Sequence, residues 1–323
     1  MIKICHWVIT KRCNLKCIHC IASTGSKREL NTKKALEVLN SLYNLGCKKL
    51  YITGGEPLIR TDIFEILKEA KRKKMKLALL TNGLLLNNQT IYFLKKYVDE
   101  IGISIDGSSS KINDQIRGSK TFKKIIKAIS ILKTYKIPIT LYITINKINY
   151  SDFGDILKLV RSLKIPNIRV NEISLRGRAY KNRKYLSINN YPNNTTEKYL
   201  LNSLKSNLGS DFKKHLRMIY NKNCGADLNT IVLSPTGYIY PCIEILQKCP
   251  EHHFGSILNF TPERMQKYGY IVSNTSISQC PYKTITGKTF SICLNKPKIN
   301  CCLIPFYANQ KNKNIKTTIP KVG

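Results

Sequence analysis

Three cysteines near the start of the chain, Cys13, Cys17 and Cys20, have the residue type and spacing of a metal site. Thiolates bind iron–sulfur clusters, and a cubane cluster has four iron corners, so three cysteines leave one iron without a protein ligand. That open corner can bind a substrate or a cofactor. A structural zinc site needs a fourth Cys or His, and the ring of His19, between two of the cysteines, does not easily reach the same metal. The spacing favours a cluster, although the triplet alone leaves zinc open.

The elements that would position these cysteines follow a repeating pattern. Short β-branched runs alternate with helical patterns, which is typical of βα units around a parallel sheet. We expect the first helix to begin at Asn31 or Thr32 and to end at Gly46. The fold class predicted is α/β, a partial (β/α)6 barrel with a small C-terminal iron–sulfur domain. The strands are expected at 4–9, 48–53, 76–81, 100–105, 138–145 and 167–173, and the helices at 32–45, 61–74, 88–97, 121–135 and 151–163.

Polar segments follow several of the expected strands, and such loops gather at the carboxyl edge of a parallel sheet, where ligands bind. Gly54, Gly55, Glu56 and Pro57 follow the second strand, and the glycines allow a backbone to approach a ligand closely. Glu56 adds an acceptor suited to an ammonium group. Taken alone, these segments could equally be ordinary turns, since Asn-Gly and Asp-Gly favour positive φ. The others are Thr81 and Asn82 after the third strand, Ser104 and Asp106 at the fourth, and Asn146 after the fifth.

The ordered set of motifs resembles the radical S-adenosylmethionine (radical SAM) enzymes. The resemblance rests on Cys-x3-Cys-x2-Cys with His19 before the last cysteine, followed by the Gly-Gly-Glu-Pro segment, and it extends from about Cys13 to Arg178. It implies a 4Fe-4S cluster whose open iron is chelated by S-adenosylmethionine, which is cleaved to a 5'-deoxyadenosyl radical that abstracts a substrate hydrogen. It also implies an electron donor such as flavodoxin or ferredoxin.

The resemblance assigns roles to individual residues. Gly54, Gly55, Glu56 and Pro57 would contact the methionyl amine, and Ser104 the ribose. Arg117 would bind the carboxylate, since its planar fork suits a bidentate contact. Asn146 would meet the adenosine from the far side.

A second set of cysteines lies in the C-terminal third, which holds seven of the twelve. Between Cys224 and Cys242 the sequence predicts a small hairpin that turns at Gly237. This is similar to the opening of SPASM and Twitch domains, which carry auxiliary 4Fe-4S clusters, although the full SPASM cysteine pattern does not follow. We expect one auxiliary cluster, with the ligands Cys224, Cys242, Cys280 and Cys293. One of Cys301 and Cys302 could donate a hydrogen atom to a substrate radical, although either could equally be a tolerated buried thiol.

The chain carries a formal net charge of +35, from 54 Lys and Arg against 19 Asp and Glu. Such a charge suits nucleic acid, an anionic membrane or an acidic polypeptide. The lysines are scattered among Ile and Asn, as a codon bias toward A and T produces, and no arginine-rich block accompanies them, which disfavours nucleic acid. No apolar run reaches the roughly 20 residues that span a bilayer. The chain has many cysteines and does not start with a leader-like segment, so we expect it to be cytoplasmic. Because exposed clusters degrade in oxygen, we also expect an anaerobic or protected setting.

These observations define an expected domain order and two classes of enzyme. The favoured function is hydrogen abstraction from a peptide, including one with an acidic leader, for epimerisation or crosslinking of a ribosomally made peptide. The alternative is a dehydrogenase or rearrangement enzyme for a sugar, a nucleotide or a tetrapyrrole precursor. An electron-transfer protein would leave the S-adenosylmethionine motifs unexplained. The expected domains are 1–178 as the barrel, 179–223 as a helical bridge, 224–302 as the auxiliary cluster domain and 303–323 as a basic tail.

Overall fold

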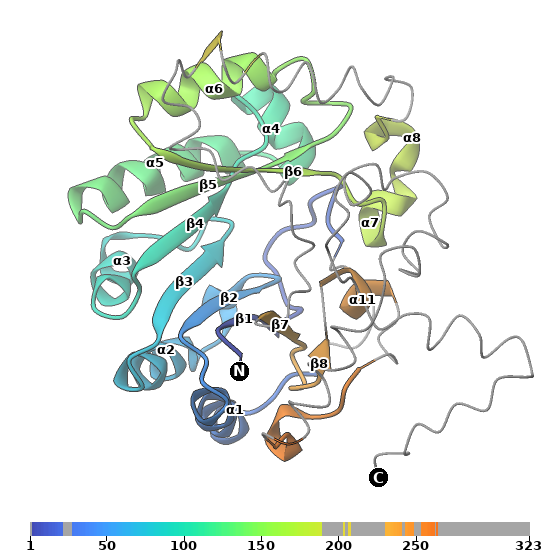
Figure 1. The fold of residues 1–323 in the computed structure, drawn as a ribbon. Helices are drawn as coiled ribbons and strands as arrows, with labels where there is room; N and C mark the ends of the chain where they lie inside the picture. Colours follow the sequence, from blue (N-terminus) through green and yellow to red (C-terminus); the bar gives the residue numbers. More distant parts are fainter. Residues whose placement is uncertain are drawn as a thin grey trace, which may run out of the picture. The chain divides into compact units, whose positions relative to one another are not determined.

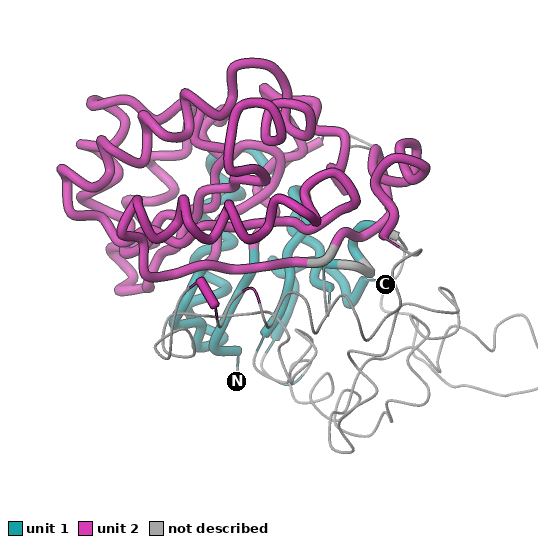
Figure 2. The backbone as a smooth tube through the Cα atoms, turned by 90° about the horizontal axis from the view of Figure 1, so that it is seen from above, with its two compact units in different colours: residues 1–6, 30–50, 220–323 teal, residues 7–29, 51–219 magenta. Residues whose placement is uncertain are grey.

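The computed structural model describes residues 2–21, 28–188, 203, 206–207, 230–240, 243–248, 253–261 and 263. The chain divides into two compact units, which Figure 2 colours teal and magenta. Unit 1 comprises residues 1–6, 30–50 and 220–323, and unit 2 comprises residues 7–29 and 51–219. The division therefore passes through the first two strands of the chain.

Strands and helices alternate along the chain (Figure 1). In chain order the elements are β1 (Ile4–Thr10), α1 (Thr32–Asn44), β2 (Lys49–Gly54), η1 (Pro57–Ile59), α2 (Ile63–Arg72), β3 (Lys76–Thr81), α3 (Asn88–Lys95), β4 (Glu100–Ser104), α4 (Ser110–Arg117), α5 (Thr121–Thr134), β5 (Ile139–Ile145), α6 (Phe153–Ser162), β6 (Asn167–Glu172), α7 (Gly177–Lys181), α8 (Arg183–Leu186), β7 (Thr230–Leu233), β8 (Ile239–Tyr240), α11 (Ile243–Lys248) and η2 (Ile257–Asn259). This order confirms the predicted six-strand α/β alternation, with boundaries shifted by one or two residues.

The sheet of unit 2 brings the ends of successive strands to one edge. The strands β6-β5-β4-β3-β2-β1 follow one another in this order in the sheet, so these neighbours in sequence are neighbours in space. Strands β3 to β6 pair in parallel, with Thr81 opposite Ile103 and Ser104 opposite Tyr142. Because the strands run in the same direction, the segments after β3, β4 and β5 emerge together, as the sequence predicted.

Helices α2, α5 and α6 of unit 2 each bury one apolar face. In α2 the buried residues are Ile63, Ile66, Leu67 and Ala70, which recur with the helical period. Helices α5 and α6 repeat this pattern, with Phe153 of α6 fully buried. The β-branched strands and these apolar stripes together form the core, because sheet faces covered by helices exclude water.

Helix α4 is an element that the sequence did not predict. Its sequence, SKINDQIR, offers only two apolar side chains, so no apolar stripe identifies it. Its buried residues include the polar Asn113 and Arg117, whose partners lie on other elements. The helix is therefore held by polar contacts that a hydrophobic pattern does not reveal.

Unit 1 confirms two local predictions. The side chain of Asn31 caps α1 by accepting from the Lys34 backbone N–H at 3.0 Å, and Gly46 follows the helix with φ 86°. Strands β7 and β8 pair antiparallel around a turn in which Gly237 has φ 81°. Within the parts that the structure describes, no helix is long and apolar enough to cross a membrane.

Candidate active site

The loop that follows β1, residues 11–20, presents the three cysteines and is called here the cysteine loop. Cys13 is exposed, whereas Cys17 and Cys20 are partly buried, and all three are free thiols. The backbone N–H of Leu15 donates to Cys13 Sγ at 3.4 Å, and the Cys20 N–H donates to the Cys17 carbonyl at 3.3 Å. The pKa of the Cys17 thiol is raised to about 11, chiefly by burial.

Two helices hold the cysteine loop in place. The Ile18 N–H donates to the Ile116 carbonyl of α4 at 3.0 Å. Arg178 of α7 donates from Nε to the Cys17 carbonyl at 2.9 Å and from its backbone N–H to the Cys20 carbonyl at 3.0 Å. These hydrogen bonds restrain the backbone around Cys17 and Cys20. The sequence marked Arg178 only as the end of the region that resembles the radical SAM enzymes. Its contact with Cys17 spans 161 residues of chain, so no local pattern indicated it.

The two glycines after β2 pack directly against the start of the cysteine loop. A Cβ on Gly54 would lie 2.3 Å from the Thr10 carbonyl oxygen, and one on Gly55 would lie 2.1 Å from that of Arg12. The Gly55 N–H donates to the Thr10 carbonyl at 2.8 Å. Hydrogen bonds at this separation leave no space for a side chain. Close approach to the protein's own backbone is therefore a reason for these glycines, in addition to the ligand contact that the sequence suggested.

Glu56 joins the ends of β2 and β3. Its carboxylate is fully buried and accepts from Thr81 Oγ1 at 2.8 Å, from the Asn82 N–H at 2.8 Å and from the Leu58 N–H at 3.1 Å. Burial raises the pKa of this carboxyl, and the three hydrogen bonds oppose that shift. A carboxylate has about four lone-pair positions, so one remains available to a further donor.

Asn82 connects the end of β3 to the cysteine loop. Its Nδ2 donates to Asn14 Oδ1 at 2.7 Å and lies 3.8 Å from Cys13 Sγ. Its Oδ1 accepts from the Leu84 N–H at 3.0 Å, which fixes the orientation of the amide. The structure thus brings the Gly-Gly-Glu-Pro segment, Thr81 and Asn82 together around the first cysteine.

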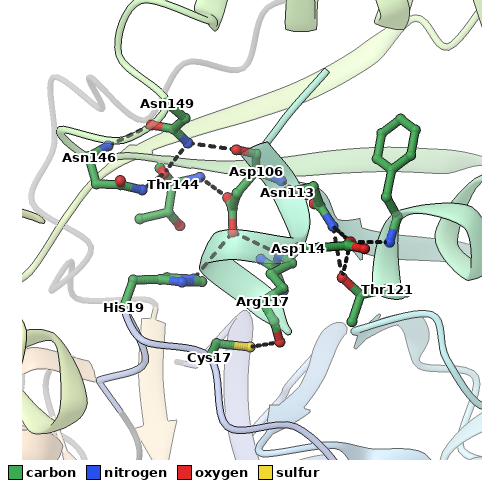
Figure 3. A network of polar contacts seen from close by, with 11 residues as sticks. Cys17, His19, Asp106, Asn113, Asp114, Arg117, Thr121, Thr144, Asn146 and Asn149 are labelled. Atoms are coloured by element: carbon green, nitrogen blue, oxygen red, sulfur yellow. Dashed lines mark hydrogen bonds and ion pairs between the residues drawn. The ribbon is translucent and has the colours of Figure 1, made fainter. Parts of the chain in front are cut away.

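Asp106 is the centre of a buried polar network (Figure 3). Its Oδ2 lies 2.7 Å from Arg117 Nε and 3.3 Å from His19 Nε2. Its Oδ1 accepts from the Thr144 N–H at 2.7 Å, and its own N–H donates to Asn113 Oδ1 at 3.0 Å. One carboxylate therefore links the cysteine loop, α4 and β5.

His19 and Arg117 keep unsatisfied polar atoms in this network. Burial lowers the pKa of His19 to about 4, with Asp106 opposing that shift and Arg117 reinforcing it, so the ring is neutral near pH 7. Among the described residues, His19 Nδ1 and Arg117 Nε are buried without a hydrogen-bond partner. Arg117 Nε lies close to Asp106 Oδ2, but its N–H is not aimed at that oxygen. Such atoms are rare in folded proteins unless a water or ligand completes them.

The ends of β4 and β5 carry the remaining predicted residues. Ser104 ends β4 and is partly buried, while Asn146 is fully buried after β5. Asn149, which the sequence analysis missed, donates to the Asp106 carbonyl and the Thr144 carbonyl at 3.0 Å each, and accepts from the Asn146 N–H at 2.8 Å. The available signal was that Asn149 follows β5, since polar loop residues at this edge of the sheet often bind ligands.

The C-terminal cysteines are not placed by the structure. Cys224, Cys242, Cys249, Cys280, Cys293, Cys301 and Cys302 lie outside the described residues. The auxiliary cluster, its ligands and the hydrogen-donor thiol therefore stay predictions.

The donor set of the cysteine loop fits an iron–sulfur cluster with an open corner. Cys13, Cys17 and Cys20 belong to one short loop, and, besides burial, the charges of the other two thiols contribute to the raised pKa of Cys17. Three thiolates without a fourth protein ligand are the ligands such a cluster needs. In the part of the chain that is described, no three His, Cys, Asp or Glu side chains are gathered as a site for a single metal ion. The unsatisfied atoms of His19 and Arg117 provide polar contacts for a ligand beside the loop.

Comparison with known proteins agrees with this geometry. Residues 7–160 match the Radical SAM superfamily model. The Fe-coproporphyrin III synthase of Methanosarcina barkeri is 33% identical over 180 residues, which are 54% of this chain and 45% of that protein. The antilisterial bacteriocin subtilosin biosynthesis protein AlbA of Bacillus subtilis is 28% identical over 249 residues, 72% of this chain and 53% of that protein.

A solved structure shares the fold. Streptococcus suis SuiB, determined with S-adenosylmethionine, superposes with a TM-score of 0.65 at 17% identity, covering 85% of this chain and 69% of SuiB. The chain spans about half the length of the curated relatives above. The family match begins just before the cysteine loop and ends in α6, so it includes the cysteines and the buried network. Residues 7–160, which hold the cysteine loop and the buried network, are therefore the part of the chain that is similar to the radical SAM superfamily.

Proposed function

We propose that the protein is a radical SAM enzyme that abstracts a hydrogen atom from a peptide substrate. The observation that carries the proposal is the cysteine loop, which holds three free thiols and whose first residues pack against the Gly-Gly-Glu-Pro segment, within the region that matches the family model. When bound, a 4Fe-4S cluster and S-adenosylmethionine supply an electron and a 5'-deoxyadenosyl radical, which removes hydrogen from the substrate.

The chain's own residues would bind and orient these groups. Cys13, Cys17 and Cys20 would hold the cluster. The remaining acceptor position of Glu56 would receive an N–H of the methionyl ammonium, and Arg117 would bind the carboxylate. We propose that Ser104 and Asn146 contact the nucleoside. The hydrogen bonds of Glu56 and the ion pair of Arg117 hold both groups in place before a ligand arrives, which reduces the entropic cost of binding.

Two observations support a peptide as the substrate. The B. subtilis relative, which aligns with 72% of the chain, is named for the biosynthesis of a bacteriocin. The net charge of +35 suits an acidic leader segment. Epimerisation and crosslinking both begin with hydrogen abstraction, and we propose one of these as the outcome.

A tetrapyrrole precursor is the second candidate substrate. The relative with 33% identity is named an Fe-coproporphyrin III synthase. Tetrapyrroles with acidic side chains also suit a basic protein. The two classes of substrate predict different products from one preparation.

The experiment incubates reconstituted full-length protein with dithionite, S-adenosylmethionine and deuterated water. One series adds the short peptides encoded beside its gene, and a parallel series adds an iron tetrapyrrole precursor with acidic side chains, with iron coproporphyrin III followed as a product. A peptide that gains one mass unit indicates epimerisation, and a loss of two indicates crosslinking or oxidation. Conversion of the tetrapyrrole alone would replace the peptide proposal by the second candidate. If no 5'-deoxyadenosine forms under any condition, both proposals are wrong.

We also propose an auxiliary 4Fe-4S cluster held by Cys224, Cys242, Cys280 and Cys293. A triple alanine variant of Cys13, Cys17 and Cys20 should then retain about four irons per chain after reconstitution. Iron near zero in that variant would exclude the second cluster.

A further inference from the structure

A basic pocket opens next to the cysteine loop within unit 2. Its volume is about 420 Å³, within the range of small-molecule sites. The lining comes from four separate segments: the cysteine loop, α4, the loop after β5 and α8. The lining residues are Ile18, Gln115, Lys147, Ile148, Lys184 and Tyr185.

Backbone hydrogen bonds hold these segments together. The Lys147 N–H donates to the Leu186 carbonyl at 3.0 Å, which joins the loop after β5 to the end of α8. Asn182, between α7 and α8, donates from Nδ2 to the Ile18 carbonyl at 3.3 Å. The pocket therefore has a framework that does not depend on a ligand.

The pocket carries positive charge without a compensating acid. No Asp or Glu is among its lining residues. In the described part of the chain, neither Lys147 nor Lys184 takes part in an ion pair, whereas Lys71 and Lys158 each contact an aspartate at 2.9 Å. Two unneutralised ammonium groups attract an anion, and partial enclosure strengthens that attraction compared with open water.

The other lining groups suit an organic anion. Ile18 and Ile148 supply apolar surface, and Tyr185 and Gln115 supply hydrogen-bonding groups. Tyr185 is 63% exposed, so its ring and hydroxyl are accessible to a ligand in the pocket. A carboxylate attached to an apolar or aromatic body would use both kinds of surface.

We propose that this pocket binds a carboxylate group of the substrate and so positions the substrate beside the cysteine loop. The inference rests on the proposed function, because it takes the ligand to be the substrate. Ile18 lies between Cys17 and His19 in the chain, so the pocket borders the cysteine loop. An acidic side chain of a peptide and a propionate of a tetrapyrrole share this chemistry.

The test measures binding of two probes to the reconstituted full-length protein in excess S-adenosylmethionine. One probe is a dansylated peptide of alternating Gly and Glu, with a Gly and Gln peptide as its neutral counterpart. The other is coproporphyrin III, followed by its own fluorescence. The variant is Lys147→Gln/Lys184→Gln. The control is Lys124→Gln/Lys127→Gln, which removes the same charge from exposed positions of α5.

At least one acidic probe should bind, and the pocket variant should raise its Kd by about threefold to tenfold, as expected for partly exposed ion pairs. The control should change Kd by less than about twofold, because distant surface charges are screened. The probe that responds identifies the source of the carboxylate. The inference is overturned if neither acidic probe binds, if the neutral peptide binds equally well, if S-adenosylmethionine displaces the probe, or if both double variants behave alike.

Failure of this inference is distinguishable from failure of the proposed function. Formation of 5'-deoxyadenosine by the wild-type protein and by the α5 control variant tests the reaction without reference to the pocket. If both form it while the pocket lysines leave probe binding unchanged, only the pocket inference is wrong. Absence of the product in both would reject the proposed function whatever the probes do.

Discussion

Replacing Asp106 by asparagine removes a negative charge from the centre of the buried network. The Asp106 side chain is fully buried and that of Arg117 is 7% exposed, with 2.7 Å between Oδ2 and Nε. Asparagine can keep the acceptor for the Thr144 N–H but leaves the Arg117 guanidinium without its counter-ion. Removing one partner of a buried ion pair costs about 3 to 5 kcal/mol, because the other charge remains desolvated. We expect a loss of stability of that size in unit 2.

Asp155→Asn is the matched control. Asp155 also forms an ion pair, with Lys158 at 2.9 Å, but the two side chains are 59% and 71% exposed. Water replaces the lost partner at such a site, so the same substitution should leave stability unchanged within error. The comparison isolates burial, since the chemical change and the type of contact are the same.

Urea denaturation followed by tryptophan fluorescence measures the difference. Trp7 is the only tryptophan, is 1% exposed and belongs to unit 2, so its emission reports on this unit. With a slope of about 2 to 3 kcal/mol per molar urea, Asp106→Asn should lower the midpoint by about 1 to 2.5 M. An unchanged midpoint in Asp106→Asn, or equal shifts in both variants, would refute the assignment of a buried ion pair.

Two further predictions test the packing of the site and the state of its thiols. Gly55→Ala should destabilise unit 2 by about 2 to 3 kcal/mol, because its Cβ would lie 2.1 Å from a backbone oxygen of the cysteine loop. At Gly154 in α6, the nearest neighbouring atom would be 3.9 Å from an added Cβ, so Gly154→Ala should stabilise unit 2 by about 0.5 to 1 kcal/mol. A urea titration in which both variants shift the midpoint in the same direction would contradict this reasoning. In cluster-free protein at pH 8, iodoacetamide should label Cys13 and leave the buried Cys47 unlabelled. Because the pKa of Cys47 is raised to about 11, its thiolate fraction is about a hundredth of that of an ordinary thiol. Mass spectrometry that finds Cys47 labelled as fast as Cys13 would show that the burial is wrong.

The sequence predicted those features that depend on local patterns. Strand positions followed from β-branched runs, and the start of α1 from Asn31, whose side chain needs only a neighbouring N–H to form a cap. The cysteine spacing located the candidate cluster site because all three ligands belong to one short loop. Each of these features is specified within a few residues of chain.

The features that were missed depend on contacts between distant residues. Asp106 meets Thr144 across 38 residues, and Arg178 meets Cys17 across 161. Helix α4 lacks an apolar stripe because its buried side chains are polar. The steric restriction at Gly55 arises only once the residues after β2 pack against the backbone of the cysteine loop. No periodicity along the chain encodes such pairings, since they arise when the strands assemble.

The most direct test of the proposed cluster site compares Cys17→Ala with Cys47→Ala. Both remove one thiol, but Cys17 belongs to the cysteine loop and Cys47 is a buried thiol of unit 1. After anaerobic reconstitution with iron and sulfide, the assay measures 5'-deoxyadenosine formed from S-adenosylmethionine and dithionite. The wild-type protein and Cys47→Ala should form the product, and Cys17→Ala should form none. Product at the wild-type rate from Cys17→Ala would contradict the assignment of the cysteine loop as the cluster site.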